Sequence, residues 1–173
     1  MDTLPLHPKL VHLPIALAIL MPMISAGLLL AWMRDLLPKR TWIVAVALQA
    51  TLVGSSVMAM RSGEDEEERV ERVVPESAIE AHEEAAEAFT WTAAGALVLF
   101  VAGAAIPGAA AARGAAGAAT AATLVVLLLG YRVGQAGGAL VYQHGAATAY
   151  TGADAAIGGG EATRQPEADE DDD

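Results

Sequence analysis

The chain contains no cysteine among its 173 residues. This absence excludes disulfides, thiolate-bound metals, iron–sulfur clusters and the C-x-x-C-H attachment of c-type haem. Any bound metal or haem iron must therefore be held by nitrogen and oxygen ligands. Basic residues are also scarce, with 10 Lys and Arg against 21 Asp and Glu, and the resulting net charge of -11 argues against nucleic acid as a partner.

Hydrophobic residues are abundant instead and make up 54% of the chain. Four apolar runs are long enough to cross the roughly 30 Å hydrocarbon layer, which takes about 20 helical residues. They predict an all-α integral membrane protein, an up-down bundle of four transmembrane helices at about 10–33, 41–60, 78–106 and 118–142. The first run lacks a basic leader and a clear cleavage site, so we expect it to stay in the membrane as the first span.

Acidic residues gather outside these spans. Residues 61–77 are expected to form an acidic outer loop with a short extramembrane helix between spans two and three, because Val70, Val73 and Val74 recur at helical spacing. Residues 1–150 would then form the four-helix domain. The remaining residues, 151–173, have the composition of a disordered acidic tail.

The short loops predict the orientation of the bundle. The link between spans one and two carries Arg34, Lys39 and Arg40, and the link between spans three and four carries Arg113. Short loops rich in Lys and Arg tend to stay in the cytoplasm. We therefore expect a multi-pass protein of the inner (plasma) membrane, with both termini on the outer side.

All four histidines fall at the end of the bundle that is predicted to lie outside. His7 and His12 open span one, His82 opens span three, and His144 follows span four. Because the helices alternate in direction, these positions meet at one membrane face. Imidazole is the commonest metal ligand and also binds haem iron, so the histidines predict a shared site. The alternative is four independent residues that anchor helix ends at the lipid headgroups.

Span four adds a glycine-lined face and one buried charge. Gly130, Gly134, Gly137 and Gly138 share that face, where either another helix or a flat macrocycle could pack. Arg132 lies about 18 Å along the helix from His144, which predicts a position near mid-membrane. A guanidinium there costs at least about 2.5 kcal/mol unless it is paired or hydrated. Its expected partners are side chains of similar depth, namely Glu87, Gln49 and Gln135, or a haem propionate.

Three separate segments carry a family resemblance. They are the opening H-P-x-x-V-H-x-P-I-A-L, the pair His82-Glu83, and the run G-G-A-L-V-Y-Q-H-G that ends at Gly145. Over about residues 4–150 the chain resembles the domain-of-unknown-function 2231 family of predicted bacterial membrane proteins, although Leu13 stands where that family often has phenylalanine. The resemblance implies four spans and a recurring set of histidines, and it implies no activity.

Three functional hypotheses follow. The first is a haem b protein for electron transfer, with His12, His82, His144 and Arg132 at the cofactor. The second is a divalent metal site (Zn, Cu or Fe) for sensing or delivery, built from His7, His12, His82, Glu83 and His144. The third is a cofactor-free scaffold. Membrane lipid is an expected partner under each hypothesis. The sequence does not decide whether the chain also binds a redox partner, another membrane subunit or a second copy of itself. It does not decide whether the protein is an enzyme.

Overall fold

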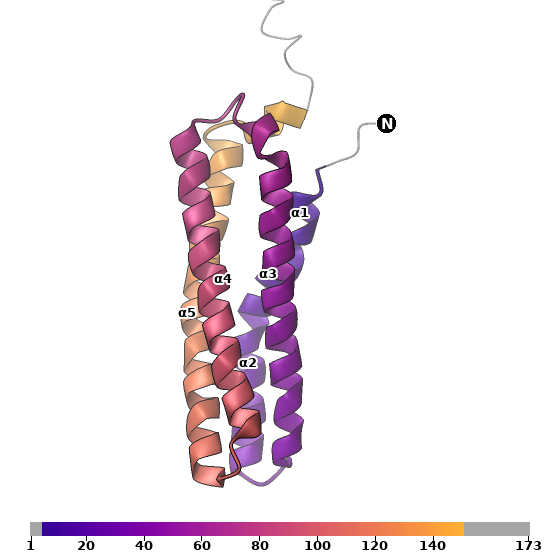
Figure 1. Cartoon of the computed structure of the whole chain (residues 1–173), viewed down its shortest axis with the longest axis vertical. Helices are drawn as coiled ribbons and strands as arrows, with labels where there is room; N and C mark the ends of the chain where they lie inside the picture. Colours follow the sequence, from indigo (N-terminus) through magenta and orange to yellow (C-terminus); the bar gives the residue numbers. More distant parts are fainter. Residues whose placement is uncertain (1–4, 151–173) are drawn as a thin grey trace, which may run out of the picture.

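The computed structural model describes residues 5–150, which form four long antiparallel helices (Figure 1). The first consists of α1 (His7–Leu10) and α2 (His12–Met33), which only Val11 separates. The others are α3 (Ile43–Val70), α4 (Glu76–Ala105) and α5 (Ala109–Tyr142). Two short 3-10 helices, η1 (Lys39–Trp42) and η2 (Ala146–Tyr150), precede α3 and follow α5. The expected tail at 151–173 lies outside the described residues.

All four rods are long and apolar enough to cross a membrane. The prediction of an all-α protein with four candidate membrane spans is therefore confirmed for the described part of the chain. The spans are longer than predicted at several ends. The fourth begins at Ala109 rather than near 118, because the alanine-rich stretch before residue 118 favours helix strongly.

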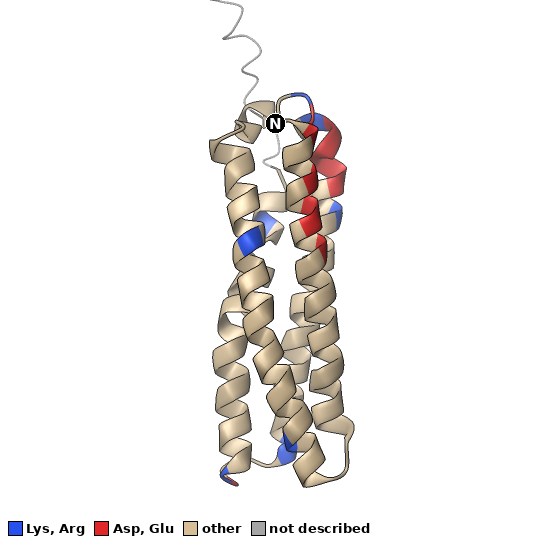
Figure 2. Cartoon of the chain, turned by 90° about the vertical axis from the view of Figure 1, so that its left-hand side faces the viewer, with Lys and Arg blue, Asp and Glu red and all other residues tan. Residues whose placement is uncertain are grey.

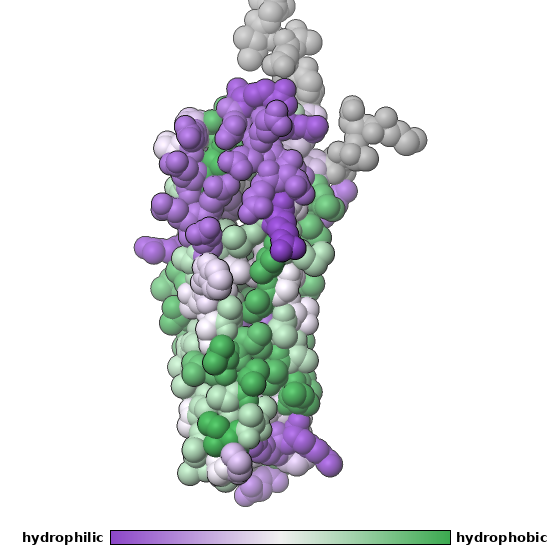
Figure 3. Space-filling view, viewed as in Figure 1, coloured by the Kyte–Doolittle hydropathy of each residue, from purple (hydrophilic) through white to green (hydrophobic). Residues whose placement is uncertain are grey.

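The helices exceed the length that a bilayer requires. α5 has 34 residues, about 51 Å at 1.5 Å per residue, against a hydrocarbon layer of about 30 Å. Figure 3 shows where the excess lies, as a hydrophilic cap above a mostly hydrophobic body. In Figure 2 the acidic residues concentrate on two neighbouring helices of this cap. We call the cap the acidic head; it comprises α1, η2 and residues 59–70, 76–87 and 133–142 of α3, α4 and α5.

The prediction of a separate short helix between spans two and three is wrong. α3 continues without interruption to Val70, and residues 71–75 alone connect it to α4. No proline occurs in α3, so nothing stops the helix at the membrane surface, whereas Pro75 ends the connection and precedes α4. Most of the predicted acidic loop is therefore a helical wall of the head.

Small side chains bring the helices together in the apolar body. The fully buried alanines lie on three helices: Ala45, Ala93, Ala112, Ala116 and Ala119. Such residues allow close backbone approach, which is how membrane helices pack without a hydrophobic driving force between them. Trp42 fills the basic end of this core. Its ring stacks on Phe100 with centroids 5.2 Å apart, and its indole N–H donates to the Phe100 carbonyl at 3.0 Å.

Gly103 tests this close packing. A Cβ at Gly103 would lie 2.9 Å from Trp42 Nε1 and 3.3 Å from the Cα of Ala116. We expect Gly103→Ala to lower the unfolding free energy by about 1–3 kcal/mol through overpacking, despite the better helix propensity of alanine. Gly95→Ala is the control, because a Cβ added at Gly95 would meet no atom within 4 Å. Thermal unfolding in detergent should separate the two variants, and equal melting temperatures would contradict the packing.

The orientation remains a prediction that single cysteines can test. Arg72, in the connection between α3 and α4, and Gly108, between α4 and α5, are both exposed and lie at opposite ends of the bundle. The native chain has no cysteine to react in the background. In intact cells, a membrane-impermeant maleimide should label Arg72→Cys and miss Gly108→Cys. The reverse pattern would place the acidic head inside.

Candidate functional site

His7 is held against α3 at the beginning of α1. Its Nδ1 lies 2.9 Å from the carbonyl oxygen of Ala59 and 3.1 Å from Ser62 Oγ. A Cβ on Gly63 would lie 3.4 Å from the ring, so the imidazole rests directly on the α3 backbone. A carbonyl oxygen can only accept, so Nδ1 carries the proton and donates it. The lone pair of the ring is then on Nε2.

His82 comes from α4 and packs against α5. A Cβ on Gly137 would lie 3.1 Å from the His82 Cε1, and a backbone group of Val133, one helical turn away, is within hydrogen-bonding reach of the ring. The Nδ1 of His82 is buried and has no hydrogen-bond partner among the described residues. Buried polar atoms rarely stay unpaired, so this nitrogen requires a ligand, a water or an ion.

The two imidazoles are half-buried and lie next to each other in the head. Their ring centroids are 6.2 Å apart and their planes are inclined by 87°. α1 and α3 fix one ring, and α4 and α5 fix the other. Each ring has one nitrogen engaged by a backbone group and a second nitrogen with no described partner. We call this arrangement the His7–His82 pair.

Glu66 fastens both ends of the described chain to α3. Its Oε1 accepts the backbone N–H groups of Leu6 at 2.7 Å and His7 at 3.3 Å, and its Oε2 accepts the Tyr150 hydroxyl at 2.7 Å. A carboxylate suits the first turn of a helix, where N–H groups lack partners. Partial burial together with the Glu66 carboxylate raises the pKa of Tyr150 to about 12. Glu66 therefore sets the position of His7 through its backbone.

Removing this carboxylate tests its structural role. We expect Glu66→Ala to cost about 1–3 kcal/mol of unfolding free energy, because two backbone donors and one hydroxyl lose a charged acceptor. Glu68→Ala is the matched control, since Glu68 is exposed and forms no hydrogen bond or ion pair with another described residue. Thermal unfolding of both variants measures the difference. Equal stability would show that Glu66 does not hold the head together.

The structure does not bring the other predicted ligands to the His7–His82 pair. The side chain of His12 is exposed, because five residues turn a helix by about 500°, which places His12 about 140° around from His7. His144 is half-buried beyond the end of α5, and Glu83 instead lies near the carboxylates of Glu64 and Glu67. Within residues 5–150, no three His, Asp or Glu side chains are placed to hold one metal ion.

Arg132 lies higher on α5 than the sequence predicted. On this face Gly130 meets Phe89 of α4 and Gly137 meets His82, so Arg132 is level with Glu87, at the base of the acidic head. Its side chain is exposed rather than buried. The guanidinium is therefore not buried as expected among the described residues, and α5 continues beyond it into the head for about three turns. Its depth in the membrane stays a prediction.

The glycine-lined face of α5 serves helix packing at two of its four positions. Phe89 lies against Gly130 and His82 against Gly137, whereas no atom is within 4 Å of a Cβ placed on Gly134 or Gly138. This outcome matches the helix-packing alternative. A Cβ at position 137 would crowd the His82 ring, at 3.1 Å from its Cε1, which the sequence pattern alone did not reveal.

Sequence reasoning missed the α3 side of the site. Ala59, Ser62, Gly63 and Glu66 follow the i, i+3, i+4, i+7 spacing of a single helix face, and all four lie against Leu6 or His7. This spacing can be read as one helix face only if the helix continues past residue 60. The second span was predicted to end at about residue 60, so the shared face was not recognised.

Four antiparallel candidate spans with a polar helical head define the class of this protein, a multi-pass membrane bundle. Comparison with known families supports this class. Residues 3–150 match the model of the family described as "Predicted membrane protein (DUF2231)", and the chain belongs to that family. No curated protein and no solved structure matches it.

Proposed function

We propose that the acidic head binds one copper(I) ion between His7 and His82, for metal sensing or delivery. One observation carries the proposal. The centroids of two imidazole rings that different helices hold are 6.2 Å apart, and the buried Nδ1 of His82 has no partner among the described residues. An ion between the rings would use that nitrogen and the Nε2 of His7. Neither nitrogen is engaged by another described residue.

The separation of the rings suits a single ion. A metal–imidazole bond is about 2.0–2.1 Å, and two such bonds plus the radii of the two rings are comparable to the observed centroid distance. The contact from His7 Nδ1 to the Ala59 carbonyl is typical of metal-binding histidines, whose second nitrogen usually donates to a carbonyl or carboxylate. That contact fixes both the tautomer and the direction of the ring.

The small number of ligands favours copper(I). Structural zinc sites take four protein ligands, and no third His, Asp or Glu of the described chain is placed to join this pair. Copper(I) accepts two nitrogen ligands in a linear arrangement. Carboxylates on the same head, among them Glu64, Glu67 and Glu83, would raise the local concentration of cations.

The packing around the rings favours an ion over haem b. Gly63 and Gly137 bring backbone to within contact of each imidazole, which leaves little space for a macrocycle beside the rings. Two cavities, of about 310 and 400 Å³, lie on the surface of the bundle, and neither histidine lines them. We therefore propose no role for haem b. Arg132, which was expected to pair with a haem propionate, has no such role in this proposal.

Metal loading tests the proposal. Purified protein is incubated with copper(I) under anaerobic, reducing conditions or with zinc(II), desalted, and assayed by mass spectrometry for metal per chain. We expect one copper ion per chain and weaker retention of zinc. If neither metal is retained, the His7–His82 pair is a structural contact and the cofactor-free scaffold takes the place of the metal proposal.

A further inference from the structure

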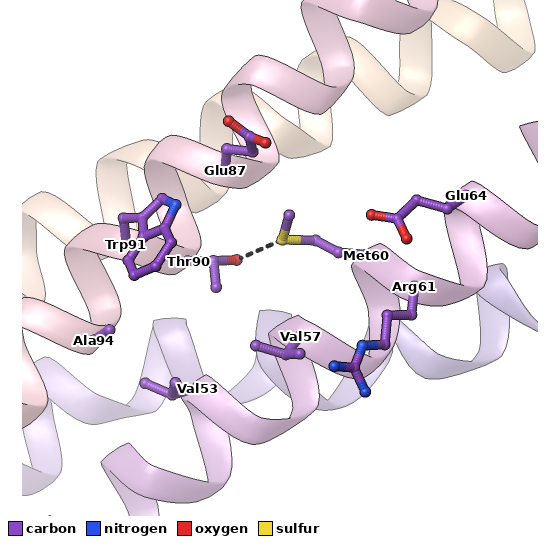
Figure 4. A pocket seen from close by; sticks show the side chains of 9 residues that line it. All are labelled: Val53, Val57, Met60, Arg61, Glu64, Glu87, Thr90, Trp91 and Ala94. Carbon is purple, nitrogen blue, oxygen red and sulfur yellow. Dashed lines mark hydrogen bonds between the residues drawn. The ribbon is translucent and has the colours of Figure 1, made fainter.

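A lateral groove opens between α3 and α4 where the acidic head meets the apolar body (Figure 4). Its volume is about 310 Å³. The hydroxyl of Thr90, on α4, donates to the Met60 sulfur, on α3, at 3.2 Å and links its two walls. The groove lies apart from the His7–His82 pair and shares no lining residue with it.

The lining of the groove divides by polarity along the membrane normal. Toward the body, the walls are apolar and consist of Val53, Val57, Ala94 and the ring of Trp91. Toward the head they carry three charges: Arg61, Glu64 and Glu87. Trp91 is 75% exposed and lies one helical turn from Glu87, where the charged lining gives way to the apolar lining. Tryptophan is enriched at such a boundary, at the level of the lipid headgroups. The groove therefore spans the boundary between acyl chains and headgroups.

The three charged side chains have no partners within the described part of the chain. None of them forms an ion pair or a hydrogen bond there. In Figure 4 the guanidinium of Arg61 points away from Glu64, and Glu87 lies on the opposite wall, on α4. One cation and two anions are thus presented separately around a single opening.

We propose that this groove binds a phospholipid with a primary amine headgroup, of the phosphatidylethanolamine class. The lipid phosphate would lie at Arg61, and the ammonium, which has three N–H donors, would lie between Glu64 and Glu87. An acyl chain would follow Val53, Val57 and Trp91 into the membrane. The two carboxylates disfavour an anionic headgroup, and a choline headgroup has no N–H to donate.

Native mass spectrometry of delipidated protein provides the test. Phosphatidylethanolamine, phosphatidylcholine and phosphatidylglycerol with identical acyl chains are added singly, and bound lipid is counted for each. We expect the ethanolamine lipid to bind on the order of threefold to tenfold more tightly than the other two. Soluble phosphoethanolamine should not displace it, because the acyl chain contributes much of the binding.

Matched variants assign the binding to this groove. Arg61→Gln should weaken all three lipids, while Glu87→Gln should reduce the preference for ethanolamine over glycerol headgroups. The controls are Arg132→Gln and Glu84→Gln, two exposed residues of the same types that do not line the groove. Equal binding of the three lipids, tighter binding of the glycerol lipid, or the same effect from Arg61→Gln and Arg132→Gln would overturn the proposal.

Discussion

His82→Ala is expected to weaken copper binding in the head strongly, and His7→Ala is expected to do the same. Either change leaves one imidazole, and a single neutral nitrogen ligand holds an ion weakly. The affinity should fall by about 100-fold or more in each variant. The double variant should bind no more weakly than either single one, because groups that share one ion are strongly non-additive. Competition titration against a copper(I) chelator measures all three.

The two remaining histidines are the controls for this experiment. The sequence suggested that His12, His82 and His144 act as a unit, with His7 as an additional member. In the structure, His12 is exposed, and within the described region His144 forms no ring contact or hydrogen bond with the pair. His12→Ala and His144→Ala should therefore keep the wild-type affinity. Losses as large as that of His82→Ala would favour the larger histidine group and would contradict the two-histidine site.

Gly137→Ala should weaken copper binding about tenfold, or by about 1.4 kcal/mol, without altering either histidine. The new Cβ would lie 3.1 Å from the His82 Cε1, so the ring must move by a few tenths of an ångström from its position. Alanine normally stabilises a helix by up to about 1 kcal/mol relative to glycine. The displaced ring should cancel that gain.

Gly134→Ala is the matched control, one turn earlier on the same helix. Nothing lies within 4 Å of its added Cβ, so helix propensity alone should act and the melting temperature should rise. Copper affinity should not change. If the two substitutions have the same effects on melting and on affinity, the contact between Gly137 and His82 does not position the ring.

The class of fold follows directly from the sequence. Four apolar runs separated by polar loops have few alternatives in a bilayer, where only a helix or a closed barrel satisfies its own backbone. The ends of the helices were less predictable, because the hydropathy of a run reports where the membrane ends and not where the helix ends. α3 and α5 both continue beyond the apolar segment into the head.

The part of the site that could be predicted depended on where the helices end and on how each is rotated about its axis. The clustering of histidines at one end is visible from topology alone, and the structure brings His7 and His82 together as that argument implies. Which histidines face each other depends on rotation about each helix axis, and one residue changes that by about 100°. His12 and Arg132 were therefore assigned to the right helices, but both side chains are exposed in the structure and not buried as expected.

X-ray absorption at the copper edge of the loaded protein tests the central proposal most directly, because it counts the ligands. We expect two nitrogen neighbours at about 2 Å, with the outer-shell signals of two imidazole rings. His7→Ala or His82→Ala should reduce the imidazole signal, and His12→Ala should leave it unchanged. A first shell of oxygens without imidazole, or an unaltered spectrum in the His82→Ala protein, would contradict the site.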